Sequence, residues 1–261
     1  MSKPMRLAVL GDPVGHSRSP AIHNAAMRHL GIEGRYEAIR AGAAELAHAV
    51  SELRSGALHG INVTMPLKEE AARLADVLTD EASRSGSVNT LRPRDHRVEG
   101  HSTDVIAARF AVADQRFEAS APILVLGSGG AAAAALVGVA GRVVFLSARD
   151  PERAAALAER AGIDVGLIRF GAGVAGAVVV NATPLGMRGE SLPENIVGPA
   201  SGVVDLAYGD APTPTVQRAR ESGLALMDGI EFLVLQAVAS FQWWTGVPAP
   251  VEVMLDAARK A

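Results

Sequence analysis

Short apolar runs separated by polar and helix-forming segments follow one another along most of this chain. Buried strands are predicted at residues 7–11, 35–39, 61–64, 123–126, 142–147, 177–180, 203–206 and 224–226. Continuous apolar runs are typical of parallel strands whose two faces are covered by helices. Helices are predicted at residues 21–30, 43–53, 230–246 and 251–261, and a hairpin turn at residues 93–96. The pattern therefore predicts an α/β protein.

A glycine turn stands between the run at residues 123–126 and an alanine-rich segment. It has the form G-x-G-x-x-A, with Gly127, Gly129 and Ala132 at the marked positions. Gly127 permits a tight turn, Gly129 leaves room for a pyrophosphate, and Ala132 lets helix and strand pack closely. The N–H groups of the helix start then face the anion. The motif predicts nucleotide binding; the alternative is a glycine-rich loop without a ligand.

The end of the next predicted strand carries two arginines and one acid, Arg149, Asp150 and Arg153. The adenine ribose lies at this position in such folds, where an acid favours NAD and an arginine favours the 2′-phosphate of NADP. Two cations against one carboxylate favour NADP. The alternative is that Asp150 only caps the following helix, which is compatible with either cofactor.

Two features near the N-terminus suggest a site for a small carboxylate and a proton donor. Ser17 and Ser19 precede Pro20 at a predicted helix start, where hydroxyl and N–H groups suit an anion; the alternative is a capping Ser19 and a solvated Ser17. Lys68 falls in the first helical turn after Pro66, where the helix dipole disfavours a cation. Such a lysine suits proton exchange, whereas the alternative is a solvent-facing lysine offset by neighbouring glutamates.

Three further polar positions have local explanations of their own. Thr103 or Asp104 is predicted to cap a helix that starts near residue 105, and a single aspartate there is more often a cap than a catalyst. Polar residues follow the strand at 177–180, and Asp205 ends another, which is where ligands bind in open parallel sheets. The tryptophans of the apolar segment at residues 230–246 are predicted to be core or interface residues.

Composition narrows the class of protein. The 261 residues are 49% apolar, which is enough for a sizeable core, and the net charge of −3 does not indicate a nucleic-acid partner. The absence of cysteine excludes disulfides, thiolate catalysis and cysteine-bound metals. The seven histidines show no ligand spacing, so no metal site is expected. Without a signal-like N-terminus or 18 uninterrupted apolar residues, we expect a soluble cytoplasmic protein without membrane contact.

Several short motifs occur along this chain in an order that is typical of one enzyme family. They are residues 15–20 (GHSRSP), 62–68 (NVTMPLK), 88–91 (VNTL), 103–104 (TD), the glycine turn, 181–183 (NAT), 205–208 (DLAY), and 228–229 (DG) with Gln236. Together they resemble the shikimate dehydrogenase family over nearly the full chain. The resemblance implies reversible, NADPH-dependent reduction of 3-dehydroshikimate to shikimate, a step toward chorismate and the aromatic amino acids.

The resemblance also implies residue roles. Lys68 and Asp104 match the catalytic pair. The matching substrate-binding residues are Ser17, Ser19, Thr64, Asn89, Asp104, Tyr208 and Gln236. The matching cofactor-binding residues are Gly127, Ser128, Gly129, Gly130, Ala131, Arg149, Arg153, Thr183, Leu206 and Gly229. It implies a mixed α/β substrate domain, residues 1–104 plus 236–261, and a Rossmann-type doubly wound NADP domain, residues 105–235, in a monomer or homodimer.

The chain departs from the family pattern at Ser102, Val105, Asp150 and Glu231, which suggests altered substrate choice or slow turnover. A rival is therefore an NAD-preferring quinate/shikimate dehydrogenase, and another is a related binding protein with little turnover. The intact Lys68 and Asp104 argue against the second. A methylene-tetrahydrofolate dehydrogenase is a third rival, but paired serines favour a small carboxylate.

Overall fold

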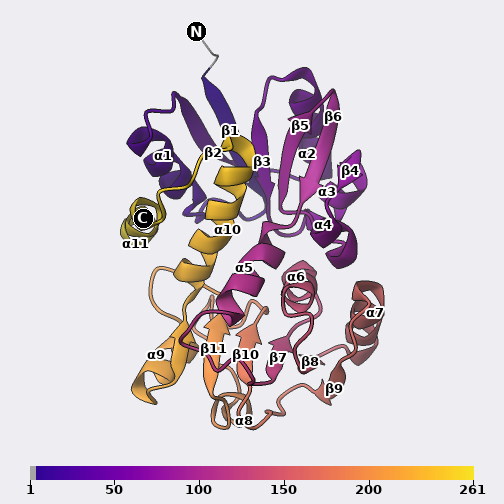
Figure 1. Cartoon of the computed structure of the whole chain (residues 1–261), viewed down its shortest axis with the longest axis vertical. Helices are drawn as coiled ribbons and strands as arrows, with labels where there is room; N and C mark the ends of the chain where they lie inside the picture. Colours follow the sequence, from indigo (N-terminus) through magenta and orange to yellow (C-terminus); the bar gives the residue numbers. More distant parts are fainter. Residues whose placement is uncertain (1–3) are drawn as a thin grey trace. The chain divides into compact units, whose positions relative to one another are not determined.

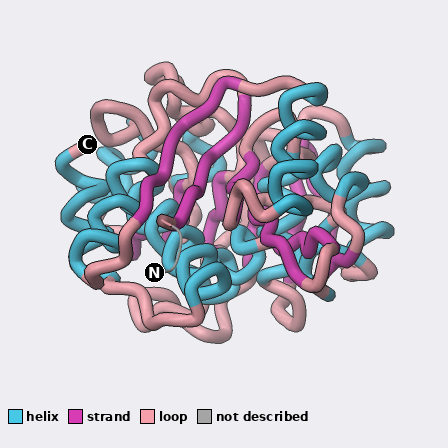
Figure 2. Tube along the Cα trace, turned by 90° about the horizontal axis from the view of Figure 1, so that it is seen from above, coloured by secondary structure: helices cyan, strands magenta, loops and turns pink. Residues whose placement is uncertain are grey.

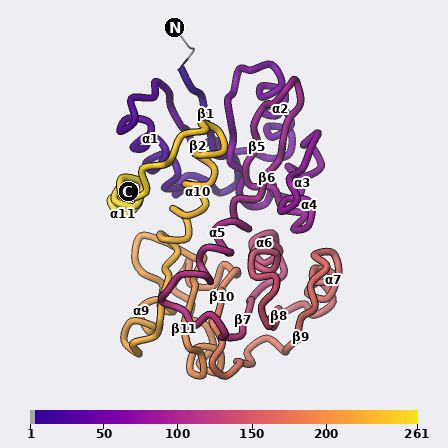
Figure 3. The backbone as a smooth tube through the Cα atoms, in the orientation of Figure 1, coloured from indigo at the N-terminus to yellow at the C-terminus, as the bar shows by residue number. Residues whose placement is uncertain are grey.

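The computed structural model describes residues 4–261, which form two compact units. The first unit contains the chain up to Thr103 together with Leu233–Ala261, and the second unit is Asp104–Phe232. Each unit is built on a sheet of six strands. The chain thus completes most of the first unit, forms the second, and returns to the first, as the yellow C-terminal segment beside the indigo strands shows (Figure 3).

The sheet of the first unit is mixed, in the order β2-β1-β3-β5-β6-β4. Its strands are β1 (Met5–Gly11), β2 (Gly34–Arg40), β3 (Gly60–Val63), β4 (Val77–Leu78), β5 (Thr90–Arg94) and β6 (Arg97–His101). Strand β1 pairs in parallel with β2 and β3, and β5 is antiparallel to β3 and β6. The predicted hairpin turn is confirmed between β5 and β6, where Asp95 and His96 have φ of 50° and 63°. Two successive positive φ values give the turn that matches strand twist.

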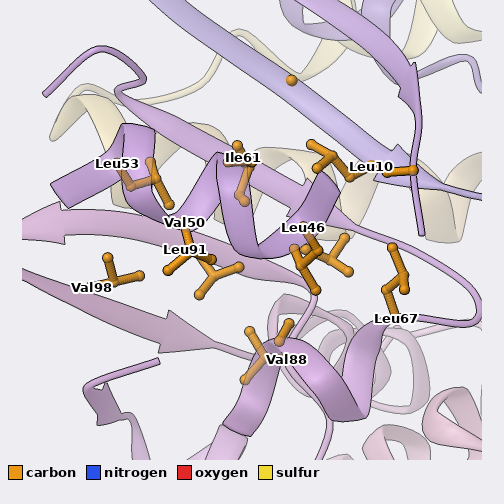
Figure 4. Packing of buried hydrophobic residues seen from close by; sticks show 14 of the residues in the cluster. Leu10, Leu46, Val50, Leu53, Ile61, Leu67, Val88, Leu91 and Val98 are labelled. Carbon is orange, nitrogen blue, oxygen red and sulfur yellow. The ribbon is translucent and has the colours of Figure 1, made fainter. Parts of the chain in front are cut away.

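Helices cover the first sheet. They are α1 (Ser19–His29), α2 (Ala43–Ser55), α3 (Lys68–Leu74), α4 (Asp80–Ser85) and α11 (Val251–Lys260), together with most of α10 (Gly229–Thr245). Helix α11 lies beside α1 (Figure 1). Leu46, Val50 and Leu53 follow the helical repeat of α2 and face the sheet, where they pack in one buried cluster with Ile61 and Leu91 (Figure 4). Most polar residues of α2 lie outside this apolar face and are exposed.

The sheet of the second unit is wholly parallel, in the order β12-β11-β10-β7-β8-β9. Its strands are β7 (Ile123–Leu126), β8 (Val144–Ala148), β9 (Gly166–Arg169), β10 (Val178–Asn181), β11 (Gly202–Asp205) and β12 (Ala225–Met227). In chain order this is the 3-2-1-4-5-6 arrangement of the Rossmann fold, in which ligands bind at the carboxyl ends of the strands. The α/β prediction is confirmed, although β9, an exposed edge strand, was not predicted.

The helices of the second unit are α5 (Thr103–Val112), α6 (Gly130–Gly138), α7 (Pro151–Ala161), α8 (Glu194–Val197) and α9 (Pro214–Glu221). Pink loops join them to the magenta strands in Figure 2. Helix α6 packs closely against the backbone of α5. A Cβ added to Gly138 would lie only 2.7 Å from the Val105 carbonyl oxygen, so the glycine allows this approach. Val105 itself is fully buried. Val105, which stands where the family pattern has a small residue, is therefore part of the core.

His23 of α1 lies in an aromatic cluster inside the first unit. Its ring stacks on Tyr36 with centroids 4.4 Å apart and lies 5.4 Å from Trp244. The Trp244 indole N–H donates to the Leu91 carbonyl oxygen at 3.0 Å, so this half-buried tryptophan is anchored to strand β5. Both ring nitrogens of His23 are buried without a hydrogen-bond partner. Burial lowers the pKa of His23 to about 3, so the folded protein holds this imidazole neutral.

We expect His23→Phe to make the protein less sensitive to acid. The unfolded chain protonates His23 near pH 6.5, whereas the folded chain does so only near pH 3. The unfolded state therefore binds one more proton between these values, and stability falls by about 1.4 kcal/mol per pH unit as pH decreases through this window. Phenylalanine keeps the stacking and removes the titration. Urea unfolding from pH 7 to 4 measures the slope, with the exposed His48→Gln as control; an unchanged slope in His23→Phe would contradict the assignment.

Candidate active site

A buried polar cluster in the first unit is centred on Asn62 of β3. Its side-chain amide donates to the Asn89 carbonyl oxygen at 3.0 Å, to Thr90 Oγ1 at 2.9 Å and to Ser240 Oγ at 3.1 Å. Its oxygen accepts from the Tyr36 hydroxyl at 2.7 Å. Asn62 therefore ties β3 to β2, β5 and α10 through one side chain.

Asn89 extends this cluster to Thr103 and to the predicted site residue Gln236. Its amide nitrogen donates to Thr103 Oγ1 at 2.9 Å and to Gln236 Oε1 at 3.4 Å, and its oxygen accepts from the Thr103 backbone N–H at 2.7 Å. The Gln236 amide nitrogen donates to the Leu233 carbonyl oxygen at 2.8 Å. The structure thus brings Asn89 and Gln236, both predicted to bind substrate, into contact within one unit.

Ser17 and Ser19 stand at the start of α1, but Ser19 is not its cap. The helix begins at Ser19, so the capping position falls on Arg18, which makes no side-chain capping bond. Ser17 Oγ instead accepts from the Ser19 backbone N–H at 3.3 Å. The predicted cap at Ser19 is therefore wrong. A capping Ser19 would require the helix to begin at Pro20, whereas it begins at Ser19 itself. Ser19 is buried and Ser17 half-buried.

Thr64 and Lys68 flank the turn that joins β3 to α3. The Thr64 carbonyl oxygen accepts from the Leu67 N–H at 2.9 Å, which closes the turn. Lys68 lies in the first turn of α3, as predicted, although the helix begins at Lys68 itself rather than at Pro66; its side chain is half-buried. Its carbonyl oxygen accepts from the Val88 N–H at 3.1 Å, which anchors the helix start beside the segment that carries Asn89.

Asp104 and the helix that carries it differ from prediction. Helix α5 begins at Thr103, two residues before the predicted start near Val105, so Thr103 and Asp104 belong to the helix. The prediction that either residue caps the helix from outside it is wrong. The Asp104 side chain is buried. Lys68 belongs to the first unit and Asp104 to the second.

The glycine turn of the second unit has the geometry that its sequence predicts. Gly127 has φ of +116°, which side chains disfavour, and a Cβ there would lie 3.0 Å from the Ala182 carbonyl oxygen. Gly129 precedes α6, and no atom lies within 4 Å of its Cβ position. Ala132 is fully buried. Open space above an uncapped helix start, with no side chain on Gly129, fits a bound pyrophosphate.

The end of β8 presents the predicted pair of arginines. Asp150 is the capping residue of α7, and its Oδ1 accepts from the Arg153 backbone N–H at 3.0 Å. The capping explanation for Asp150 is therefore confirmed. The side chains of Arg149 and Arg153 are both exposed beside it. The site combines one carboxylate engaged by the backbone with two exposed guanidinium groups.

The remaining predicted cofactor residues lie after the carboxyl ends of β10 and β11 and at the start of α10. Thr183 follows β10, and Leu206 follows β11, with Tyr208 two residues further on. Gly229 is the first residue of α10, and a Cβ there would lie 2.3 Å from the Ala207 carbonyl oxygen. Only glycine allows this contact between the helix start and the loop after β11.

Glu231, a departure from the family pattern, stabilises the start of α10. Asp228 Oδ1 accepts from the Glu231 backbone N–H at 3.0 Å, and Glu231 Oε2 accepts from the Asp228 N–H at 3.0 Å. This reciprocal pair is a capping box. Arg116 contacts Glu231 Oε1 at 3.0 Å and donates to the Leu226 carbonyl oxygen at 2.7 Å. The glutamate thus has a structural role in the second unit.

The sequence did not predict the residues that hydrogen-bond to the buried polar side chains of these candidate sites. Tyr36 and Ser240 hold Asn62, and Thr213 contacts Asp205. One local signal was present for Ser240, which follows Gln236 by one helical turn in an otherwise apolar helix. Tyr36 and Thr213 gave no such signal, because their partners lie in other elements.

The parallel sheet and its glycine turn define a dinucleotide-binding protein of the Rossmann class. Residues 9–91 match the model of the shikimate dehydrogenase substrate binding domain, and residues 229–259 match the shikimate 5′-dehydrogenase C-terminal domain. A Thermus thermophilus protein named shikimate dehydrogenase (NADP(+)) is 37% identical, with 98% of each chain covered. The chain belongs to the shikimate dehydrogenase family.

Solved structures of relatives agree in fold. A Thermus thermophilus shikimate 5-dehydrogenase in complex with NADP(H) and shikimate has a TM-score of 0.87 and 35% identity, covering 98% of this chain and 99% of that one. The Mycobacterium tuberculosis shikimate dehydrogenase has a TM-score of 0.86 and 35% identity, covering 99% and 100%. No helix among residues 4–261 has the length and apolar content needed to cross a membrane.

We expect Glu231→Ala to destabilise the protein by about 1 kcal/mol, because it leaves the Asp228 N–H without its capping partner. Glu231→Gln keeps the reciprocal bond and loses only the ion pair with Arg116, so a smaller loss is expected. Urea unfolding measures both. Glu252→Ala, an exposed change in the first turn of α11, serves as control. Equal stability of the alanine and glutamine variants would contradict the capping role.

Proposed function

We propose that this chain is an NADP-dependent shikimate dehydrogenase, which reduces 3-dehydroshikimate to shikimate reversibly on the route to chorismate and the aromatic amino acids. The 37% identity to an NADP(+) shikimate dehydrogenase over 98% of both chains carries the proposal. The glycine turn and the exposed Arg149 and Arg153 support it independently, because they suit a dinucleotide with a 2′-phosphate. We expect such a biosynthetic enzyme in the cytoplasm.

The second unit is proposed to hold NADP. The residues proposed to bind its phosphates are Gly127, Ser128, Gly129, Gly130, Ala131, Arg149 and Arg153. Thr183, Leu206 and Gly229 are proposed to line the nicotinamide side. When bound, NADPH supplies the hydride. This assignment is supported by the open space at Gly129 and by the loops at the carboxyl ends of β10 and β11.

The first unit is proposed to bind the substrate. Ser17 and Ser19, at the start of α1, suit its carboxylate because hydroxyl groups and helix N–H groups converge there. Thr64, Asn89 and Gln236 are proposed to bind the ring hydroxyls, and Tyr208 of the second unit is proposed as a further contact. The side-chain bonds that fix Asn89 and Gln236 support this role, since a binding group must hold its orientation.

Lys68 and Asp104 are the proposed catalytic residues. A ketone that gains a hydride becomes an alkoxide, which needs a proton. The Lys68 ammonium donates that proton and, in the reverse direction, the neutral amine accepts it. Asp104 is proposed to bind the reacting hydroxyl. Lys68 begins α3, and its carbonyl oxygen accepts from the Val88 N–H at 3.1 Å. This contact places Lys68 beside the segment that carries the proposed substrate-binding residue Asn89, which supports the assignment.

We expect Lys68→Met to lower the turnover number at least about 100-fold, the usual contribution of a positioned acid or base. Shikimate affinity should change little, because ring contacts come from other residues. Steady-state oxidation of shikimate with NADP⁺ and equilibrium binding of shikimate measure the two effects. Lys260→Met, at an exposed position in α11, is the control. Unchanged turnover in Lys68→Met would refute the assigned role.

We expect Arg149→Gln and Arg153→Gln each to raise the KM for NADP⁺ about tenfold, which corresponds to ~1.4 kcal/mol, since each removes a cation from the 2′-phosphate. The KM for NAD⁺ should stay nearly constant. Initial rates with both coenzymes and shikimate measure the selectivity, and quinate as a second substrate separates the quinate/shikimate alternative. Arg160→Gln, exposed in the last turn of the same helix, is the matched control. Equal losses with NAD⁺ would contradict phosphate recognition.

A further inference from the structure

Asp205 ends β11 as a fully buried carboxylate whose hydrogen-bond donors are all neutral. Its Oδ1 accepts from the Asn181 amide at 2.8 Å and from the Ala207 N–H at 3.1 Å. Its Oδ2 accepts from the Thr213 hydroxyl at 2.6 Å. Burial raises the pKa of Asp205, although these three bonds partly offset the rise. A buried carboxylate without a cation is costly, so its contacts call for an explanation beyond packing.

The first contact fixes the orientation of Asn181. Its amide nitrogen donates to Asp205 and also to the Leu185 carbonyl oxygen at 3.0 Å. The Asn181 side-chain oxygen therefore faces Thr183. It accepts one hydrogen bond from the Thr183 hydroxyl at 2.6 Å and another from the Thr183 backbone N–H at 3.2 Å. A reversed amide would place donor against donor on the Thr183 side. Asp205 thus determines, through Asn181, how Thr183 is held.

The second contact shapes the loop after β11. The bond from the Ala207 N–H to Asp205 spans two residues, which folds Leu206 and Ala207 into a side-chain-stabilised turn. The Ala207 carbonyl oxygen then lies against Gly229, where a Cβ would be only 2.3 Å away. Asp205 therefore influences Leu206 directly and the start of α10 through Ala207.

The third contact fixes Asp205 itself. The Thr213 hydroxyl donates to Asp205 and accepts from the Val216 N–H at 3.2 Å, so it also caps α9. Thr213 further supports the loop after Thr183, since a Cβ on Gly186 would lie 3.0 Å from the Thr213 Cβ. One hydroxyl thus locks the carboxylate and joins α9 to the two loops.

We propose that Asp205 is a positioning residue for the nicotinamide side of the cofactor site, holding Thr183, Leu206 and Gly229 in one arrangement without touching the ligand. The inference rests on the proposed function, which assigns those three residues to NADP. The two ends of the cofactor are then served by different residues. The arginines at the end of β8 act on the 2′-phosphate, whereas Asp205 acts on the loops after β10 and β11.

Binding of NADP⁺ and of 2′,5′-ADP, measured by calorimetry on the full chain, separates the two ends. The 2′,5′-ADP fragment keeps the 2′-phosphate and lacks the nicotinamide. We expect Asp205→Ala and Thr213→Val to weaken NADP⁺ binding about tenfold, as loss of a supporting residue commonly does, and to change 2′,5′-ADP binding less than about twofold. If Asp205→Ala fails to fold, Thr213→Val decides the result.

Conservative variants test whether the hydrogen bonds carry the effect. Thr213→Ser keeps the hydroxyl, and Asp205→Asn keeps an oxygen for Asn181 while its amide donates to Thr213, whose oxygen can accept. Both should bind NADP⁺ within about threefold of wild type. Thr215→Val is the matched control, because it removes another buried threonine of α9, which accepts only from the Leu192 N–H.

The outcomes separate this inference from the function on which it rests. A wild-type chain that does not bind NADP⁺ would overturn the proposed function and this inference together. Wild-type binding with no loss in Asp205→Ala and Thr213→Val would overturn the inference alone. So would equal losses for NADP⁺ and 2′,5′-ADP, or a loss in Thr215→Val as large as in Thr213→Val, since either would show a general structural effect.

Discussion

Buried asparagine side chains impose the constraint on which both units depend. An amide removed from water must find partners for its two donors and its acceptor within the protein. Asn62 and Asn89 find them across β3, β5 and α10, and Asn181 finds them across β11 and the loop after β10. Each amide has one orientation that satisfies its partners. The segment before β5 and the loop after β10 are therefore held by the protein itself, which is what a binding site requires.

Features set by local chemistry were predictable from the sequence, and features set by distant partners were not. The glycine turn, the buried parallel strands and the first-turn position of Lys68 follow from neighbouring residues, and the structure has them. The predicted helix starts after Ser19 and near Val105 are wrong, because Ser19, Thr103 and Asp104 are already helical rather than capping residues. The contacts of Tyr36 with Asn62 and of Thr213 with Asp205 join different elements, and no local pattern predicts such a pair.

Two of the departures from the family pattern, Val105 and Glu231, have structural explanations within the second unit. Val105 is buried in the core where α5 meets α6. Glu231 completes a capping box and pairs with Arg116, so its carboxylate is occupied by the helix start and a guanidinium. A larger or charged side chain at these places is thus accommodated by partners that the same chain supplies. Altered chemistry is not needed to explain either residue.

Asp150, which follows the carboxyl end of β8, bears on the choice between NAD and NADP. An acid at this position normally favours NAD by binding the ribose hydroxyls and repelling a phosphate. Here one carboxylate oxygen accepts from the Arg153 N–H, so the acid is engaged in capping α7. That bond also satisfies one of the N–H groups with which a helix start would otherwise bind an anion. The proposed recognition of a 2′-phosphate therefore rests on the guanidinium groups of Arg149 and Arg153, which flank Asp150 in the sequence and are exposed.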